Sequence, residues 1–435
     1  MSSLAKVMLS FGVMVTGSDM NESYQTKELE ALGIRVFISH AAENITDADL
    51  VVYTAAIKED NPELKAAVSS GVETLERSVF LGQLMRSYQF PCCIAGTHGK
   101  TTTTSMAGIV ASDAGLDPTI MVGGSVKELN GNLRIGNSDI FITESCEYVE
   151  SFLKFFPETA IILNVDLDHL DYFTGIEHII SSFNKFASLV PPSGAVIVNG
   201  EDQNAMKAVS RINAPVITFG FDAKNDYYAE NIRFNDMGFA TFSVMHNGCS
   251  IGEISLSVPG KHNILNSLSV VIYSLRLNIP FEKIAKSLAR FKGSVRRFEQ
   301  KGTYNGAVLI DDYAHHPTEI MTTMDSASKY KDKKITAIFQ SHTYTRTKEL
   351  LKEFSECFDL ADEIIVTDIF AAREKDTGLV HPSDLVGLLK DRGKDAKHIS
   401  KFEDIASYLK EIAAPDRLII TIGAGDVFKI FDMLK

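Results

Sequence analysis

One stretch of the sequence decides the fold: CCIAGTHGKTTTTSMAGIVASDA, residues 92–114. It opens with a short apolar strand at residues 92–95 and closes with a helix from Thr102 to Ala114. The turn between them is made of Gly96, Thr97, His98, Gly99, Lys100 and Thr101. In such a turn, glycines let backbone N–H groups close around phosphate oxygens, and the dipole of the following helix adds to the attraction. The stretch therefore predicts a phosphate-binding loop.

We expect this loop to bind ATP. Lys100 would reach the outer phosphates, the Thr101 hydroxyl would ligate Mg²⁺, and Thr102 would open the helix. The common pattern GxxxxGK[ST] needs a glycine at position 94, where this chain has Ile94, so the loop is a shorter variant. A glycine-rich turn with an exposed lysine is the alternative, but the strand before it and the helix after it favour ATP.

The rest of the chain alternates predicted strands and helices, which indicates an α/β fold built from parallel βα units. At 435 residues the chain exceeds one ordinary core. We expect three α/β domains: a Rossmann-like domain (1–89), a central P-loop ATPase domain (90–294) and a second Rossmann-like domain (295–435). The first would contain a short buried strand at residues 13–16, and the second an antiparallel patch between residues 216 and 257.

Composition excludes several other classes. The net charge of −13, without a run of basic residues, argues against nucleic-acid binding. No apolar stretch reaches membrane-spanning length, and residues 1–17 lack the basic start and cleavage site of a signal peptide. The five scattered cysteines contain no CxxC pair, so neither a disulfide framework nor structural zinc is expected. We expect a cytoplasmic protein that acts on small molecules.

Acidic residues follow two predicted strands of the central domain. Glu144 and Glu147 come after the strand at residues 140–143, and the segment NVDLDH, which ends at His169, follows the next strand. Both groups would lie at the carboxyl ends of parallel strands, where open α/β sheets bind their ligands. Carboxylates suit Mg²⁺, and a second divalent ion accepts a histidine. Some of these acids would instead cap helices: we expect this of Asp166 and Asp171, while Glu144 stays open between a cap and a ligand. We favour Glu147 and His169 as ligands.

Ordered motifs along the whole chain resemble those of the Mur ligases. They are GTHGKTTTTS, TESCEYVESFLKFFP, NVDLDHLDYF, PGKHNILNSL, RRFE, DDYAHHPTEI, FQSHTYTRT and FAAREKDTG. Within that family the chain is most similar to the members that attach L-alanine to UDP-N-acetylmuramate. The resemblance thus implies a peptidoglycan-precursor ligase that uses ATP and Mg²⁺.

The resemblance also implies roles for individual residues in nucleotide binding. Thr101 and Glu147 would hold the Mg²⁺ of the nucleotide, and His169 would help to hold a second ion. His262 and Asn266 are similar to the pair that contacts adenine in the family.

Residues near the start of the third domain are similar to further ATP contacts. Arg296 and Arg297 resemble arginines that enter the site from the interdomain linker, and Asp312 resembles an ATP contact. Lys100, Arg297 and His316 would take part in catalysis.

The acceptor amino acid would be bound by the third domain. His315 and Tyr313 would line its site, and Arg346 would clamp its α-carboxylate, an anion that suits a bidentate guanidinium. On spacing alone, His315 and His316 could form a solvated turn and Arg346 a surface ion pair. Ser341 and Thr343 stand where many members have proline and a second arginine, so amino-acid affinity is expected to differ.

The implied reaction proceeds in two steps. The muramate carboxylate attacks the γ-phosphate to give an acyl phosphate, and the amine then displaces phosphate from the acyl carbon. Two other functions stay open: a ligase that attaches a whole tripeptide to the same sugar in cell-wall recycling, and a nucleotide-binding protein with impaired catalysis.

The beginning of the sequence carries its own expectation. A nucleotide-binding βαβ unit has a first strand, a glycine-rich turn, a helix and then an acid roughly 20 residues further on. Here the sequence opens on a helix, and Asp19 already stands at the position of that acid. We therefore expect Ser18 and Asp19 to contact the UDP-sugar, and the missing strand and glycine turn to lie upstream of Met1.

Overall fold

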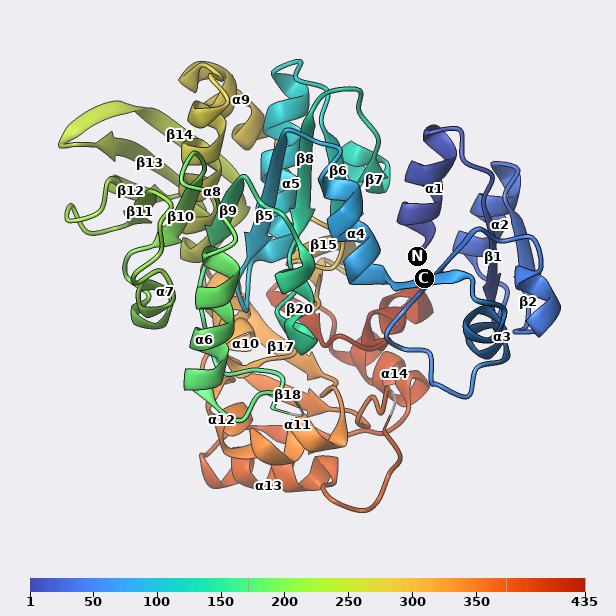
Figure 1. The fold of residues 1–435 in the computed structure, drawn as a ribbon. Coiled ribbons are helices and arrows are strands. Elements are labelled where there is room, and N and C mark those ends of the chain that lie inside the picture. The colour runs from blue at the N-terminus through green and yellow to red at the C-terminus, as the bar shows by residue number, and fades with distance from the viewer. Residues whose placement is uncertain (171, 373, 435) are drawn as a thin grey trace.

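The computed structural model describes residues 1–170, 172–372 and 374–434, and it confirms an α/β fold. Asp171, one of the two expected helix caps, and Arg373, in the FAAREKDTG motif, lie outside the described residues. Three bodies follow one another along the chain, coloured blue, cyan to yellow, and orange to red in Figure 1. Among the described helices, none is both long enough and apolar enough to cross a membrane.

The first body, residues 1–85, contains two separate two-stranded parallel sheets, β1-β2 and β3-β4. Its elements are α1 (Ser2–Ser10), β1 (Thr16–Asp19), α2 (Tyr24–Ala31), β2 (Arg35–Ile38), a 3₁₀ turn η1 (Ala42–Ile45), β3 (Leu50–Tyr53), α3 (Pro62–Ser70), β4 (Glu73–Glu76) and α4 (Arg77–Met85).

The predicted strand at residues 13–16 is placed wrongly, since β1 starts only at Thr16. Val13 and Met14 lie in the irregular segment after the turn that ends α1 at Gly12, and Met14 is 91% exposed. The run of apolar residues Val13 and Met14 was wrongly interpreted as part of a buried strand.

The second body is built on a ten-stranded sheet with the order β14-β13-β12-β11-β10-β9-β5-β8-β6-β7. Its strands are β5 (Phe90–Ala95), β6 (Thr119–Val126), β7 (Gly131–Arg134), β8 (Ile140–Glu144), β9 (Thr159–Ile162), β10 (Ala195–Asn199), β11 (Val216–Gly220), β12 (Tyr227–Phe234), β13 (Phe239–His246) and β14 (Cys249–Pro259). Its helices are α5 (Lys100–Asp113), η2 (Lys127–Leu129), η3 (Tyr148–Lys154), α6 (Ile176–Ala187), α7 (Gln203–Ala208), α8 (Lys261–Arg276) and α9 (Phe281–Arg290).

The expected antiparallel patch comprises only β12, β13 and β14, because β11 runs parallel to both of its neighbours.

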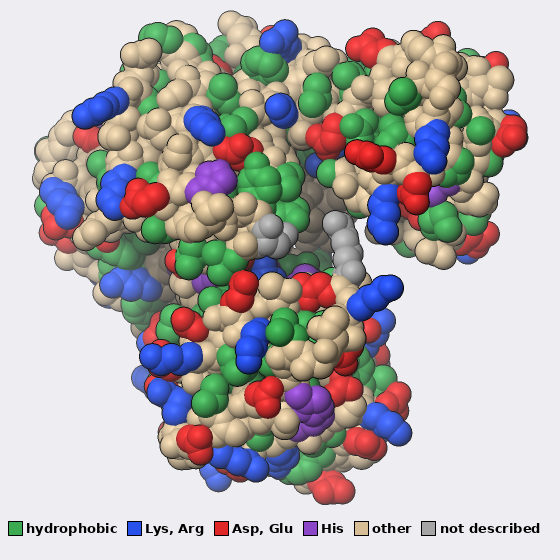
Figure 2. All heavy atoms as spheres, turned by 60° about the horizontal axis from the view of Figure 1, so that its bottom comes forward, with side chains coloured by type: hydrophobic (Ala, Val, Ile, Leu, Met, Phe, Trp, Pro, Cys, Tyr) green, Lys and Arg blue, Asp and Glu red, His purple; other side chains and the backbone are tan. Residues whose placement is uncertain are grey.

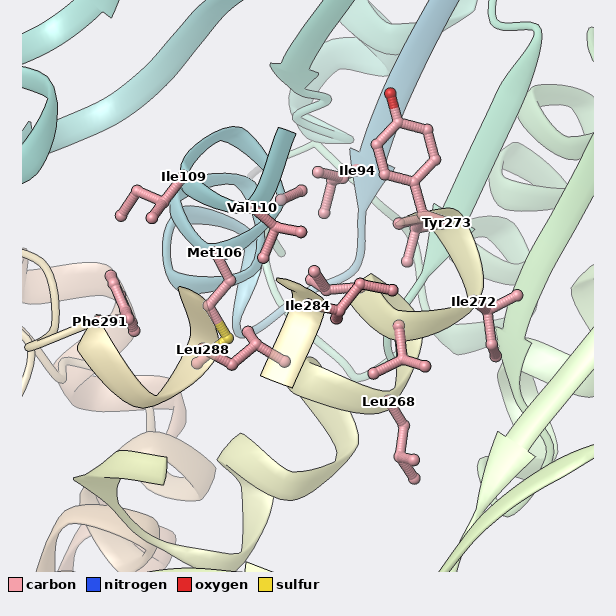
Figure 3. Close-up of a cluster of buried hydrophobic side chains, with 14 of the residues drawn as sticks. Ile94, Met106, Ile109, Val110, Leu268, Ile272, Tyr273, Ile284, Leu288 and Phe291 are labelled. Atoms are coloured by element: carbon pink, nitrogen blue, oxygen red, sulfur yellow. The ribbon is translucent and has the colours of Figure 1, made fainter. Parts of the chain in front are cut away.

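Both faces of this sheet are buried, as the alternation along β5 shows. Cys92 and Ile94 pack into a cluster formed by α5, α8 and α9, while Cys93 and Ala95 pack against the opposite face, under α4 and α6. Figure 3 shows the first cluster, in which Met106 of α5 points toward Leu288 of α9. A parallel strand covered on both faces is apolar throughout. This burial fixes β5, and with it the start of the phosphate loop.

The third body has a six-stranded sheet of order β15-β16-β20-β17-β18-β19, parallel except for the edge strand β15. Its strands are β15 (Glu299–Tyr304), β16 (Ala307–Asp312), β17 (Lys334–Phe339), β18 (Glu363–Val366), β19 (Ala396–His398) and β20 (Arg417–Ile422). Its helices are α10 (Pro317–Ser328), α11 (Tyr344–Glu349), α12 (Leu351–Glu356), α13 (Pro382–Asp391), α14 (Phe402–Ile412) and η4 (Val427–Leu434). The space-filling view shows a hollow where the bodies meet (Figure 2).

Candidate active site

The phosphate loop joins β5 to α5 through two glycines whose replacement would strain the backbone. Gly99, the residue before α5, has φ +86°, and a Cβ there would lie 2.9 Å from the amide oxygen of Asn266. Gly96 has φ +141°, and its Cβ would lie 3.0 Å from that of Leu163. Both positions combine a backbone conformation that favours glycine with a close neighbour. The loop therefore keeps the tight turn that a phosphate site needs.

Lys100 lies across this loop instead of extending into solvent. Its Nζ donates to the Thr97 carbonyl at 3.1 Å and to the Gly96 carbonyl, and it pairs with Glu147 Oε2 at 3.0 Å. Burial disfavours the charged amine, but the Glu147 carboxylate outweighs it and raises the pKa of Lys100. Glu147 is almost fully buried. A cation is thus held at the phosphate end of the loop.

Oxygen ligands of the kind that Mg²⁺ prefers lie close to Lys100 and Glu147. The Thr101 hydroxyl donates to Glu144 Oε2 at 3.1 Å, and the backbone N–H of Gly123 donates to Glu144 Oε1 at 2.6 Å. Burial raises the pKa of Glu144. His169 Nε2 lies 3.9 Å from Glu147 Oε1. One hydroxyl, two carboxylates and an imidazole fit the donor chemistry of divalent ions.

A cleft of about 570 Å³ opens beside the loop, between the second and third bodies. Eight of the residues singled out in the sequence line it: His98, Gly99, Thr101, Thr102, His262, Asn266, Arg297 and Asp312. The facing wall comes from α10 and includes Thr322, Thr323 and Ser326. A volume of this size is that of a small-molecule site.

At one end of the cleft lie polar groups of α8. Asn263 donates to the Pro259 carbonyl at 2.7 Å and accepts from the Asn266 amide at 3.0 Å. Burial lowers the pKa of His262 to about 4, so its imidazole is neutral. A neutral ring and fixed amides suit an uncharged heterocycle such as a nucleobase.

The two neighbouring arginines point to different places. Arg296 donates to the carbonyls of Gly423 and Gly425 at 2.6 and 2.9 Å, and its Nε lies 3.0 Å from Asp311. It is thereby held inside the third body and is absent from the described lining of the cleft. Arg297 does line the cleft, with its guanidinium 3.7 Å from Glu319 Oε1. The structure therefore brings Arg297, and not Arg296, toward the phosphate loop.

Asp312, at the end of β16, lies on the third body's side of the cleft. Its carboxylate accepts from the backbone N–H groups of Phe298 at 3.0 Å and Ala314 at 2.8 Å, and from the Thr323 hydroxyl at 3.1 Å. Burial, partly offset by Arg297, raises the pKa of Asp312 to about 6.

The loop after β9 makes three successive contacts with the third body. Asp166 accepts from the Thr318 hydroxyl at 2.8 Å, the Leu167 carbonyl lies 3.0 Å from His316 Nε2, and Asp168 pairs with Arg346 at 3.0 Å. We call Asp166–Asp168 the bridging loop.

His98 adds a further contact across the cleft. Its Nε2 lies 3.5 Å from Asp166 and its Nδ1 lies 3.3 Å from Glu319. Burial opposes protonation, but the two carboxylates outweigh it and raise the pKa of His98 to about 9. A charged His98 therefore links the phosphate loop to α10.

His98, Asp166 and His316 present potential ligand atoms within 4.8 Å of one another. His316 is nevertheless occupied on both ring nitrogens. Nδ1 accepts from the Thr318 N–H at 3.3 Å, so Nε2 carries the hydrogen that faces Leu167. The cluster is thus a contact between two bodies, and His316 anchors it.

Arg346 is surrounded by the residues that are expected to bind the amino acid. His342 Nδ1 lies 3.2 Å from one guanidinium nitrogen of Arg346, and burial lowers the pKa of His342 to about 4, so the neutral ring accepts. The His315 ring centroid lies 5.6 Å from that of Tyr313 and 5.9 Å from that of His342. Burial also lowers the pKa of His315.

Ser18 and Asp19 lie apart from this cleft, on β1 of the first body. Ser18 is 3.1 Å from His40 Nδ1 and donates to Glu63, and Asp19 accepts from the Asn21 N–H at 3.1 Å. The structure does not bring these two residues to the phosphate loop.

Three important partners were not singled out from the sequence: Asp168, Glu319 and His342. Each belongs to a motif that also contains a predicted residue, as Asp168 does beside His169. These three residues could have been found as further charged or polar residues within the quoted motifs. Spacing within a motif does not show, however, which other element such a residue contacts.

Known proteins match this chain along its length. Residues 1–89 match the catalytic domain of the Mur ligase family, residues 94–274 the Mur ligase middle domain, and residues 296–425 the glutamate ligase domain of Mur ligases. UDP-N-acetylmuramate–L-alanine ligase from Caldanaerobacter subterraneus is 47% identical over 430 residues, covering 99% of this chain and 94% of its own. The enzyme of that name from Acetivibrio thermocellus is 48% identical, covering 100% and 92%.

Solved structures agree with these matches. UDP-N-acetylmuramate-alanine ligase from Thermotoga maritima superimposes with a TM-score of 0.83 at 30% identity, over 100% of this chain and 95% of its own. A murein peptide ligase from Psychrobacter arcticus reaches 0.71 at 24% identity over 100% and 95%, which bears on the fold alone. With three domain matches in order and relatives nearly half identical from end to end, this chain belongs to the Mur ligase family.

Proposed function

We propose that this chain joins L-alanine to the carboxylate of UDP-N-acetylmuramate at the cost of ATP, in the cytoplasmic synthesis of peptidoglycan precursors. The observation that carries this proposal is the cleft between the second and third bodies. There the loop of Lys100 and Thr101 faces Arg297 and Asp312. The identity to ligases of that name supports the choice of substrates.

The three bodies would divide the substrates between them. Residues 1–89 would bind the UDP-sugar, with Ser18 and Asp19 among its contacts. Residues 90–294 would bind ATP through Gly96, Thr97, His98, Gly99, Lys100, Thr101, Thr102, His262 and Asn266, with Asp312 joining from residues 295–435, which would also bind the amino acid. Arg296, held by Asp311, would act on the nucleotide only by fixing the course of the linker that presents Arg297.

The first chemical step would form an acyl phosphate. A carboxylate oxygen of the muramate attacks the γ-phosphorus, and the bond to the β-phosphate oxygen breaks, so ADP leaves. Negative charge moves across the transferred group as this happens, and fixed cations stabilise it. Lys100 and Arg297 would supply this charge, and each is already opposed by a carboxylate, Glu147 or Glu319.

Mg²⁺ would be held by Thr101 and Glu147, with Glu144 beside them and His169 toward a second ion. The hydroxyl and carboxylate donors fit a hard cation, which when bound neutralises phosphate charge. When Glu147 binds Mg²⁺, Lys100 would no longer pair with it and would bind the phosphate instead.

The second step needs a neutral amine. The nitrogen attacks the acyl carbon, the carbon–oxygen bond to phosphate breaks, and a proton leaves the nitrogen. His315 donates from Nδ1 to the Tyr313 carbonyl at 3.1 Å, which leaves the lone pair of its neutral ring on Nε2. We assign the proton to this nitrogen, while His316 serves catalysis by anchoring the bridging loop.

One assay tests the proposal: phosphate release measured with ATP, UDP-N-acetylmuramate and a series of amino acids. We expect release only when all three substrates are present, with L-alanine the best acceptor. Preference for the tripeptide L-alanyl-γ-D-glutamyl-diaminopimelate would instead identify a recycling ligase. ATP binding without release under any combination would indicate a nucleotide-binding protein without ligase activity.

A further inference from the structure

The ion pair between Asp168 and Arg346 joins two bodies at the acceptor end of the site. Asp168 Oδ1 lies 3.0 Å from one guanidinium nitrogen, and both side chains are mostly buried, 11% and 15% exposed. The pair is held in place from both sides. The backbone N–H of His169 donates to Asp168 at 2.7 Å, and His342 Nδ1 lies 3.2 Å from the other guanidinium nitrogen of Arg346.

The pair also adjoins the phosphate end of the cleft. Asp168 precedes His169, whose Nε2 lies 3.9 Å from Glu147, the partner of Lys100. A molecule bound against Asp168 and Arg346 would therefore lie close to the place where the acyl phosphate forms. That is where the acceptor must be held for its nitrogen to attack.

From this arrangement we infer that Asp168 and Arg346 together form a receptor for a zwitterion, with Arg346 binding the α-carboxylate and Asp168 binding the α-ammonium of the acceptor. The inference rests on the proposed function. An α-amino acid carries both of its charged groups on one carbon atom, so it can lie beside a fixed ion pair with each charge facing its opposite. Hydrogen bonds between charged groups are the strongest of their kind in proteins.

This receptor discriminates by chemistry and not by size. A free α-amino acid satisfies both charges. A peptide has an ammonium without a carboxylate on the same carbon, and a 2-hydroxy acid has a carboxylate without an ammonium. Each can make a charge-assisted hydrogen bond to only one of the two receptor groups, so it binds with less free energy than the amino acid. The same pair would thus favour L-alanine over the tripeptide.

Because the two halves come from different bodies, the receptor exists only while those bodies are together. The simpler interpretation is that Asp168 and Arg346 merely tie the bodies, as Asp166 and Thr318 do at 2.8 Å. Losing a mere contact between the bodies would weaken the binding of every substrate alike. Losing a receptor group would selectively weaken the binding of ligands that carry an ammonium group. That difference can be measured.

The test compares L-alanine with L-lactate, which keeps the carboxylate but has a hydroxyl in place of the ammonium. In the full chain we measure the KM of L-alanine, the KM of ATP, and inhibition by L-lactate against L-alanine. For Asp168→Asn we expect the L-alanine KM to rise by about 10- to 100-fold, the loss of one hydrogen bond to a charged group. Inhibition by L-lactate and the KM of ATP should change by less than about threefold.

Thr318→Val is the matched control, since it removes a contact between the same two bodies without touching the receptor. It should change the KM of L-alanine and the inhibition constant of L-lactate by equal factors. Asp168→Glu keeps the charge and should preserve most of the selectivity between the two ligands.

Equal weakening of L-alanine and L-lactate in Asp168→Asn would overturn the receptor. If that variant fails to fold, the wild type still decides, because the receptor requires it to prefer L-alanine over L-lactate by at least about tenfold. A wild type that releases no phosphate with any amino acid would instead count against the proposed function.

Discussion

At the scale of single residues, Lys100 and Glu147 form the interaction on which the chemistry depends most. The ion pair is nearly buried and lies where charge would accumulate during phosphoryl transfer. We expect Lys100→Ala to reduce the rate of ligation by about a hundredfold or more, the usual cost of losing one such electrostatic group. Steady-state kinetics and circular dichroism would show whether activity falls while the fold persists. Retention of more than about a tenth of the wild-type rate would contradict the role of Lys100.

Arg346 offers a second prediction at this scale. Arg346→Lys keeps a positive charge but loses the planar fork that contacts Asp168 and His342 together. The KM for L-alanine should therefore rise by about tenfold or more, while the KM for ATP stays within about twofold. Equal changes in both constants would mean that Arg346 is structural or serves the nucleotide.

At the scale of elements, α4 packs against η3 through a glycine. A Cβ on Gly82 would lie 1.9 Å from the Lys154 carbonyl oxygen, so an alanine there must separate the two elements. We expect Gly82→Ala to lower the free energy of unfolding by about 1–3 kcal/mol, as overpacking does. Gly387→Ala in α13 is the control. Nothing lies within 4 Å of the added Cβ, and the change should be neutral or slightly stabilising. Thermal unfolding of both variants would compare them.

Elements were also the level at which the sequence was most informative. Apolar runs placed β5 and β8 within two residues of their ends, because strands buried on both faces are apolar throughout. The same reasoning misplaced β1, because Val13 and Met14 are exposed in the irregular segment before that strand. The family resemblance placed Arg296 and Arg297 in the site together, although their side chains diverge toward Asp311 and Glu319. The periodicity of apolar residues indicates which positions of an element are buried, but it does not show which other element packs against them.

At the scale of the whole molecule, His98 connects two bodies through charge. Its pKa of about 9 lies above the ordinary value near 6.5, so the ion pairs with Asp166 and Glu319 stabilise the fold fully below about pH 6.5. This stabilisation is lost as the pH rises through about 9. We expect His98→Gln to lower the Tm most at pH 6 and very little at pH 9.5. A difference in Tm that does not vary with pH would contradict this account.

The mixed sheet of the second body has a consequence for the order in which the chain folds. Strands β12, β13 and β14 are joined as hairpins, with His246 opposite both Tyr227 and Cys249, and such pairs close within about 1–10 μs. The strand β5 instead pairs Cys92 with Ile142 and Thr159, and must wait for long stretches of chain to return. During synthesis, the phosphate loop emerges early from the ribosome but gains its neighbours only after β9 has followed. The cleft is also lined by Arg297, Asp312 and Thr323, so the nucleotide site is complete only after the start of the third body has been made.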